Sequence, residues 1–174
     1  MAESFAEHLH EWHEFYLVVG GAAAALTGLM FVVVSIGPEI IATRAAGGVR
    51  SFVSPTIVYF TTVLAVSALM TMPHVAPRVL AAVLAVGGVM GLGYMAWIRG
   101  HRQWRESKLG LDDWFWYIAL PVLGYGLLTV AALGMWRLGL SGPFSLGAAT
   151  ILFLVIGIRN AWDLILWFAQ QRKS

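Results

Sequence analysis

The chain has 174 residues and a formal net charge of +2, and its composition is 59% hydrophobic with only 11% charged residues. A soluble domain usually has about 25% charged residues, so a large part of this protein's surface must face lipid. The sequence contains no cysteine, which excludes disulfides, cysteine-ligated metal centres and thiol catalysis.

Residues 1–14 are predicted to form a short amphipathic helix at the membrane interface, leading into the first span. Its apolar residues recur at helical spacing on one face: Phe5, Leu9, Trp12 and Tyr16. The acidic residues fall mostly on the opposite face. This segment has no Lys or Arg, so the apolar run after it is interpreted as a retained span and not as a cleaved signal peptide.

The polar face of this segment also has the spacing of a metal site, in Glu7, His10 and Glu14. His and Glu residues three or four apart on a helix can ligate a divalent ion such as Zn²⁺ or Cu²⁺. The sequence shows no closed set of ligands, and a solvated helix face is the commoner role of such pairs. A metal site is favoured only where oligomerisation brings copies of the chain together.

Five apolar segments are long enough to cross a membrane. A bilayer core is about 30 Å thick and a helix rises about 1.5 Å per residue, so about 20 apolar residues suffice. The segments are residues 15–36, 52–72, 79–98, 114–135 and 144–168. None of the segments alternates apolar and polar residues as a barrel strand does. A helix forms all of its backbone hydrogen bonds within the segment, as a membrane span must. The sequence therefore predicts an all-α, polytopic transmembrane helical bundle that forms a single domain over residues 1–174.

Small residues recur at helical spacing in two of these spans. The first span has Gly20, Ala24 and Gly28, and the third has Gly87 and Gly91. Such faces let helix backbones approach closely. They serve either packing within one subunit or contacts between the subunits of a homo-oligomer.

The second and fourth spans have features that bear on transport. A stripe of hydroxyl-bearing and small residues in the second span includes Ser54 and Thr61. It either lines a narrow polar path or donates hydrogen bonds to adjacent backbones. In the fourth span Pro121 is predicted to kink the helix and to free the carbonyl of Tyr117, because proline has no N–H.

The fifth span contains charged residues, Arg159 and Asp163, with Asn160 beside them. The two charges are four residues apart and share a helix face. Measured from Phe144 at 1.5 Å per residue, they lie about 22 Å and about 28 Å into the span. One interpretation is a snorkelling arginine paired with an aspartate, with the amide bonded to a neighbouring helix. The other is a polar vestibule, open to the cytoplasm, that binds an anion or conducts protons.

The distribution of Lys and Arg predicts the orientation. The N-terminus and the loops that share its side have only Arg78 and Arg137. The loops on the opposite side and the C-terminal tail have Arg44, Arg50, Arg99, Arg102, Arg105, Lys108, Arg172 and Lys173. By the positive-inside rule, the N-terminus lies outside and the C-terminus lies in the cytoplasm.

The sequence lacks the residues that several kinds of chemistry require. The five His residues all lie outside the predicted spans, which argues against paired axial ligands for haem. The basic loop at residues 99–108 faces anionic lipid headgroups, so membrane lipid is the expected partner and nucleic acid is not. The sequence identifies no catalytic residue and no cofactor.

Three stretches resemble a family of small bacterial multi-pass inner-membrane proteins. They are Trp-His-Glu-Phe-Tyr at 12–16, the Gly- and Ala-rich run at 20–31, and Arg-Asn-Ala-Trp-Asp at 159–163. The family has about five spans and no established activity. The resemblance therefore implies a bacterial inner membrane and supplies no site residues.

Three functions remain open. The first is a non-enzymatic integral membrane protein that forms a small channel or transporter with a polar cytoplasmic vestibule. The alternative is an accessory or scaffold subunit of a larger membrane protein complex. The third is a metal-binding membrane protein.

Overall fold

The computed structural model describes residues 7, 10–36, 48–73, 75–100, 114–137 and 141–171. These ranges contain helices and no strand. The helices are α2 (His13–Ile36), α4 (Gly48–Thr71), α5 (Pro77–Gly100), the π-helical turn η1 (Phe115–Ala119), α8 (Leu120–Trp136) and α9 (Ser141–Gln171). The predicted interfacial helix falls mostly on residues outside the described ranges.

The predicted all-α bundle is confirmed, and each predicted span has its helix. Four helical stretches are long and apolar enough to cross a membrane: His13–Ser35, Pro77–Trp97, Phe115–Trp136 and Gly142–Leu166. The fifth helix, α4, has a shorter apolar stretch, Pro55–Thr71, among the residues that the structure describes with side chains. A soluble protein would not expose helices of this length and apolarity to water, so the protein is an integral membrane protein.

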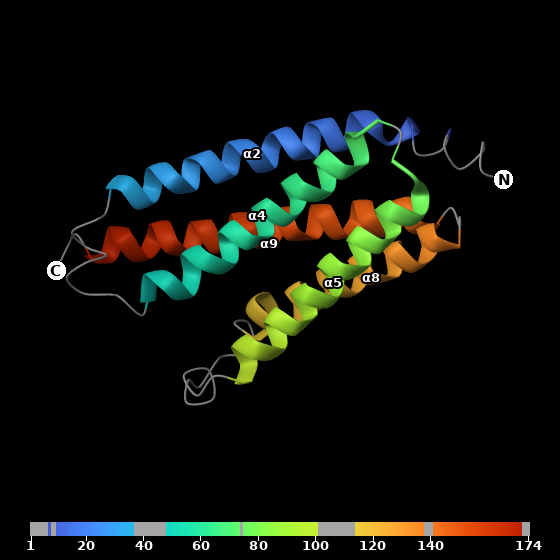
Figure 1. Ribbon diagram of the computed structural model, residues 1–174. Helices are drawn as coiled ribbons and strands as arrows, with labels where there is room; N and C mark the ends of the chain where they lie inside the picture. Colours follow the sequence, from blue (N-terminus) through green and yellow to red (C-terminus); the bar gives the residue numbers. More distant parts are fainter. Residues whose placement is uncertain are drawn as a thin grey trace.

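The helices pack side by side in the order α2, α4, α9, α8, α5, which differs from their order in the chain. The last helix, α9, lies in the middle and packs on both α4 and α8 (Figure 1). α4 and α5 follow each other in the sequence but diverge from their shared end, and each packs mainly on a different helix. The charged residues of the predicted fifth span are therefore on the central helix.

Successive helices run in opposite directions, so their ends form two groups (Figure 1). The starts of α2, α5 and α9 lie with the ends of α4 and α8, which we call the Trp12 end. The ends of α2, α5 and α9 lie with the starts of α4 and η1, which we call the Arg159 end. The helix ends therefore fall into the same two groups as the predicted loops that follow or precede them.

Two glycines let neighbouring helices approach closely within the subunit. A Cβ on Gly20 of α2 would lie 2.7 Å from the Cβ of Ser67 on α4, and a Cβ on Gly91 of α5 would overlap the ring of Tyr125 on α8. Gly28 of α2 is exposed, and no described atom lies within 4 Å of its Cβ position. The small-residue pattern thus includes both packing positions and exposed ones.

Aromatic rings join the three central helices. Phe153 of α9 stacks on Tyr59 of α4 with ring centroids 5.8 Å apart, and it contacts Tyr125 of α8 at 4.7 Å. A Cβ on Gly124 of α8 would lie 2.8 Å from the Phe153 ring, so this glycine makes room for it. All three rings are buried, and they fix the positions of α4 and α8 on either side of α9.

Candidate functional site

At the Arg159 end, aromatic side chains of η1 contact charged side chains of α9. Leu120 donates its N–H to the carbonyl of Phe115, five residues back, which defines the π-helical turn. Pro121 follows at once and is buried. The structure has a wide turn directly before the proline, while the kink and the free carbonyl of Tyr117 stay predictions. Such turns are frequent at functional sites.

We call the residues that meet here the Arg159 cluster: Trp116 and Tyr117 of η1, with Arg159, Asn160 and Asp163 of α9. Arg159 Nε lies 3.5 Å from Asp163 Oδ2, and the two side chains are 48% and 24% exposed. The guanidinium carbon lies 5.8 Å from the centroid of the Trp116 ring, a cation–π contact. Because Asp163 is one turn further along α9, the arginine side chain extends toward the Arg159 end, as a snorkelling side chain does.

Tyr117 connects η1 to this ion pair. Its hydroxyl donates a hydrogen bond of 2.9 Å to Asp163 Oδ2. Among the described residues, these two contacts of Asp163 both end on Oδ2, and Oδ1 can accept from a further donor. The cluster is thus a charged pair held in place by two aromatic residues from a different helix.

Asn160 is the buried member of the cluster, next to Arg159 on α9. The residue is 1% exposed, and its Oδ1 has no hydrogen-bond partner among the described residues. A buried amide oxygen without a partner is costly, and such groups commonly mark the place of a water molecule or ligand. The predicted bond from Asn160 to a neighbouring helix is not seen at this oxygen.

Two more buried hydroxyls have no partner within the described ranges, those of Tyr16 on α2 and Ser67 on α4. Both are toward the Trp12 end. Between them and Asn160, the hydroxyls of Tyr125 and Thr62 are hydrogen-bonded. Buried polar groups are therefore present at several levels along the bundle.

The residues predicted to line a path fall in different surroundings. Thr61 of α4 is exposed on the outside of the bundle, and the side chain of Ser54 lies outside the described residues. The next residue, Thr62, is hydrogen-bonded to Tyr125 of α8, the helix on the other side of α9. Its hydroxyl donates to the carbonyl of Val58 at 2.8 Å, so it accepts the hydrogen bond from Tyr125. The spacing pattern alone could not choose between two adjacent threonines.

The predicted metal ligands lie at the opposite end of the molecule. Glu7, His10 and Glu14 are all exposed. Among the described residues, no three His, Asp or Glu side chains come together to hold an ion. The rings of His10 and His13 lie 6.1 Å apart, which is a side-by-side contact on one helix face.

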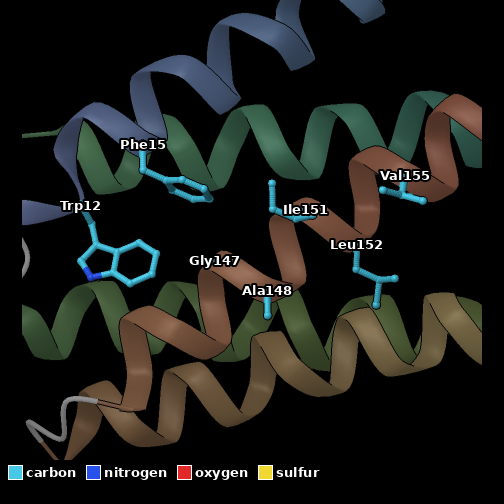
Figure 2. Close-up of a pocket in the computed structure, with 7 residues that line it drawn as sticks. All are labelled: Trp12, Phe15, Gly147, Ala148, Ile151, Leu152 and Val155. Atoms are coloured by element: carbon cyan, nitrogen blue, oxygen red, sulfur yellow. The ribbon is translucent and has the colours of Figure 1, made fainter.

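Sequence reasoning missed an open apolar groove of about 560 Å³ at the Trp12 end (Figure 2). It is lined by Trp12, Phe15, Gly147, Ala148, Ile151, Leu152 and Val155. Trp12 lies over α9, where a Cβ on Gly147 would be 2.7 Å from its ring. The sequence signal for this groove was Gly147, a glycine in the fifth span at the same level as the interfacial Trp12.

Comparison of the chain with protein families, with curated proteins and with solved structures found no match. The functional interpretation therefore depends on the chemistry and placement of the residues themselves.

Proposed function

We propose that the protein is non-enzymatic and acts as a small channel or transporter, with the Arg159 cluster as its polar vestibule. The observation that supports this best is the buried Oδ1 of Asn160, which has no partner in the described part of the chain. Asn160 is a buried residue next to Arg159 on α9, and Arg159 belongs to a charged pair that is partly exposed. A polar ligand that passes the pair would find its next hydrogen-bonding group there.

Buried polar groups further along the bundle support the same function. The hydroxyls of Ser67 and Tyr16 belong to two other helices and also lack partners within the described ranges. An apolar membrane protein interior is expected to avoid such groups unless water or a polar solute reaches them. Internal water at these positions would extend hydrogen bonding from the Arg159 end toward the Trp12 end.

The proposed orientation places the Arg159 end in the cytoplasm of a bacterial cell, at the inner membrane. The supporting observation is the excess of Lys and Arg in the loops and tail of that side. The vestibule would then take its ligand from the cytoplasm.

Purified protein in liposomes tests this function. We expect flux of protons or of a small anion such as chloride above that of empty liposomes. Arg159→Ala and Asn160→Leu should each lower this flux at least tenfold, while Arg137→Ala, at the Trp12 end, should leave it unchanged. The melting temperature of Asn160→Leu is measured as well, because the substitution removes the amide nitrogen together with the unpaired Oδ1.

Two results would contradict the proposal. One is flux equal to that of empty liposomes for protons and for every small ion tested. The other is full flux in Arg159→Ala and Asp163→Ala together with a lower melting temperature, which would make the ion pair a structural element.

The apolar groove favours a second function, that of an accessory subunit in a larger membrane complex. Ala148→Trp would place a large ring among the residues that line the groove, and Val130→Trp, on an exposed face of α8, is the matched control. In native gels of gently solubilised membranes, we expect co-migration with other chains to be lost only with the first variant. Migration of the wild type as a single chain would exclude this function.

A further inference from the structure

We propose that the Arg159 cluster binds the headgroup of a phospholipid that has both a phosphate and a primary ammonium, as phosphatidylethanolamine has. The site consists of the Arg159 guanidinium for the phosphate and the Asp163 carboxylate for the ammonium. Binding is measured without any flux, so the inference does not depend on the proposed transport.

The depth of the pair along α9 matches the headgroup level. Phe144 marks the Trp12 end of the helix, and at 1.5 Å per residue Asp163 lies about 28 Å further along. The hydrocarbon core is about 30 Å thick. Because the Arg159 side chain extends toward Asp163, its guanidinium reaches the same level. Exposed Trp97, Trp114 and Trp162 occur at this end, as is usual at the boundary of the core.

The Arg159 side chain is exposed on the surface of the bundle, among apolar residues. Arg159 is 48% exposed, and its neighbours Ile158 and Trp162 on α9 are exposed apolar residues. A guanidinium has five N–H donors, and the contact with Asp163 uses the one on Nε. The terminal NH₂ groups can therefore bind a phosphate in the bidentate geometry that arginine favours.

The carboxylate determines which headgroup fits. Asp163 lies beside the guanidinium, so a purely anionic headgroup would meet attraction and repulsion at the same place. A headgroup with adjacent phosphate and ammonium presents both charges in the complementary arrangement. Tyr117 and Arg159 both contact Oδ2, and the ammonium would donate to Oδ1. The Trp116 ring holds the guanidinium in position before the lipid arrives.

Native mass spectrometry of the full-length protein in detergent tests the assignment, with three lipids of identical acyl chains. The lipids are phosphatidylethanolamine, phosphatidylcholine, which has no N–H donor, and phosphatidylglycerol, which has no ammonium. We expect the wild type to bind phosphatidylethanolamine about three- to fivefold more tightly than either of the others, since half-exposed charge pairs contribute modestly.

Two variants separate the roles of the charges. Asp163→Asn keeps an oxygen that can accept from Tyr117. It should abolish the preference for phosphatidylethanolamine, and it should strengthen the binding of phosphatidylglycerol because the repulsion by the carboxylate is gone. Arg159→Gln should weaken binding of all three lipids. Arg137→Gln, an exposed arginine beside Trp136 at the Trp12 end, is the matched control and should alter nothing.

Three outcomes would overturn the inference. They are equal binding of the three lipids by the wild type, an unchanged preference in Asp163→Asn, and binding of soluble phosphorylethanolamine as tight as that of the lipid. The last result would assign the site to a dissolved solute. Arg159→Lys, which keeps the charge, replaces Arg159→Gln if the latter does not fold, and it should retain the preference.

Discussion

At the scale of single residues, Asp163 depends on partners from two helices. Its Oδ2 accepts from Tyr117 of η1 and pairs with Arg159 of its own helix. A carboxylate that is only 24% exposed at the edge of a membrane requires such partners, because desolvation of a charge is otherwise costly. The hydroxyl of Tyr117 is therefore expected to matter for stability as well as for the shape of the cluster.

Tyr117→Phe tests the bond between η1 and α9. A hydrogen bond to a charged acceptor contributes about 1.5–3 kcal/mol, and the partial exposure of Asp163 favours the lower part of that range. We expect a lower melting temperature in detergent. The matched control is Tyr16→Phe, which removes a buried hydroxyl that has no partner within the described residues and should cost less. An equal loss for the two variants would mean that the Tyr117–Asp163 bond does not stabilise the fold.

Some of the cluster could be predicted from sequence, and some could not. Arg159 and Asp163 were visible as two charges in an apolar span, and a spacing of four predicted the observed ion pair. Their partners Trp116 and Tyr117 were not visible, because they belong to another helix and the π-helical turn that presents them leaves no clear residue signal. The residue that bonds Tyr125 was also missed, since Thr61 and Thr62 are equally polar and only the helix rotation distinguishes them.

At the scale of helices, glycine positions determine how closely α5 and α8 can pack. Gly91→Ala would place a methyl group inside the volume of the Tyr125 ring, and we expect a loss of about 1–3 kcal/mol from overpacking. Gly93→Ala in the same helix is the control, because no described atom lies within 4 Å of its Cβ position. It should be neutral or slightly stabilising, since alanine favours the helix.

The measurement is thermal unfolding of both variants in the same detergent. Equal melting temperatures for the two would show that α5 can move away from α8 at no cost. That result would contradict the close packing seen between them.

The helices themselves were predictable because length and apolarity determine a span. Their neighbours were not, since lipid-facing and protein-facing residues are equally apolar in a membrane protein. Gly20 and Gly28 illustrate the difference: both belong to one small-residue pattern, yet one contacts Ser67 and the other is exposed. The central position of α9 likewise follows from helix packing and has no counterpart in the pattern of spans.

At the scale of the whole molecule, the number of crossings determines where the termini lie. Five crossings place them on opposite sides of the membrane, and an even number would place them on the same side. Four helical stretches meet the length and apolarity of a span, and α4 is the shorter one among the described residues. The topology therefore depends on whether α4 crosses the membrane.

Single cysteines can measure this topology, because the native chain contains none. Ser4→Cys and Ser174→Cys each introduce one reporter, to be labelled in intact cells with a maleimide that does not cross membranes. By the positive-inside rule we expect Ser4→Cys to be labelled directly and Ser174→Cys only after permeabilisation. Labelling of both from outside, or of neither, would mean that one helix does not cross. The opposite pattern would keep the five crossings and reverse the orientation, which would place the Arg159 end outside the cell.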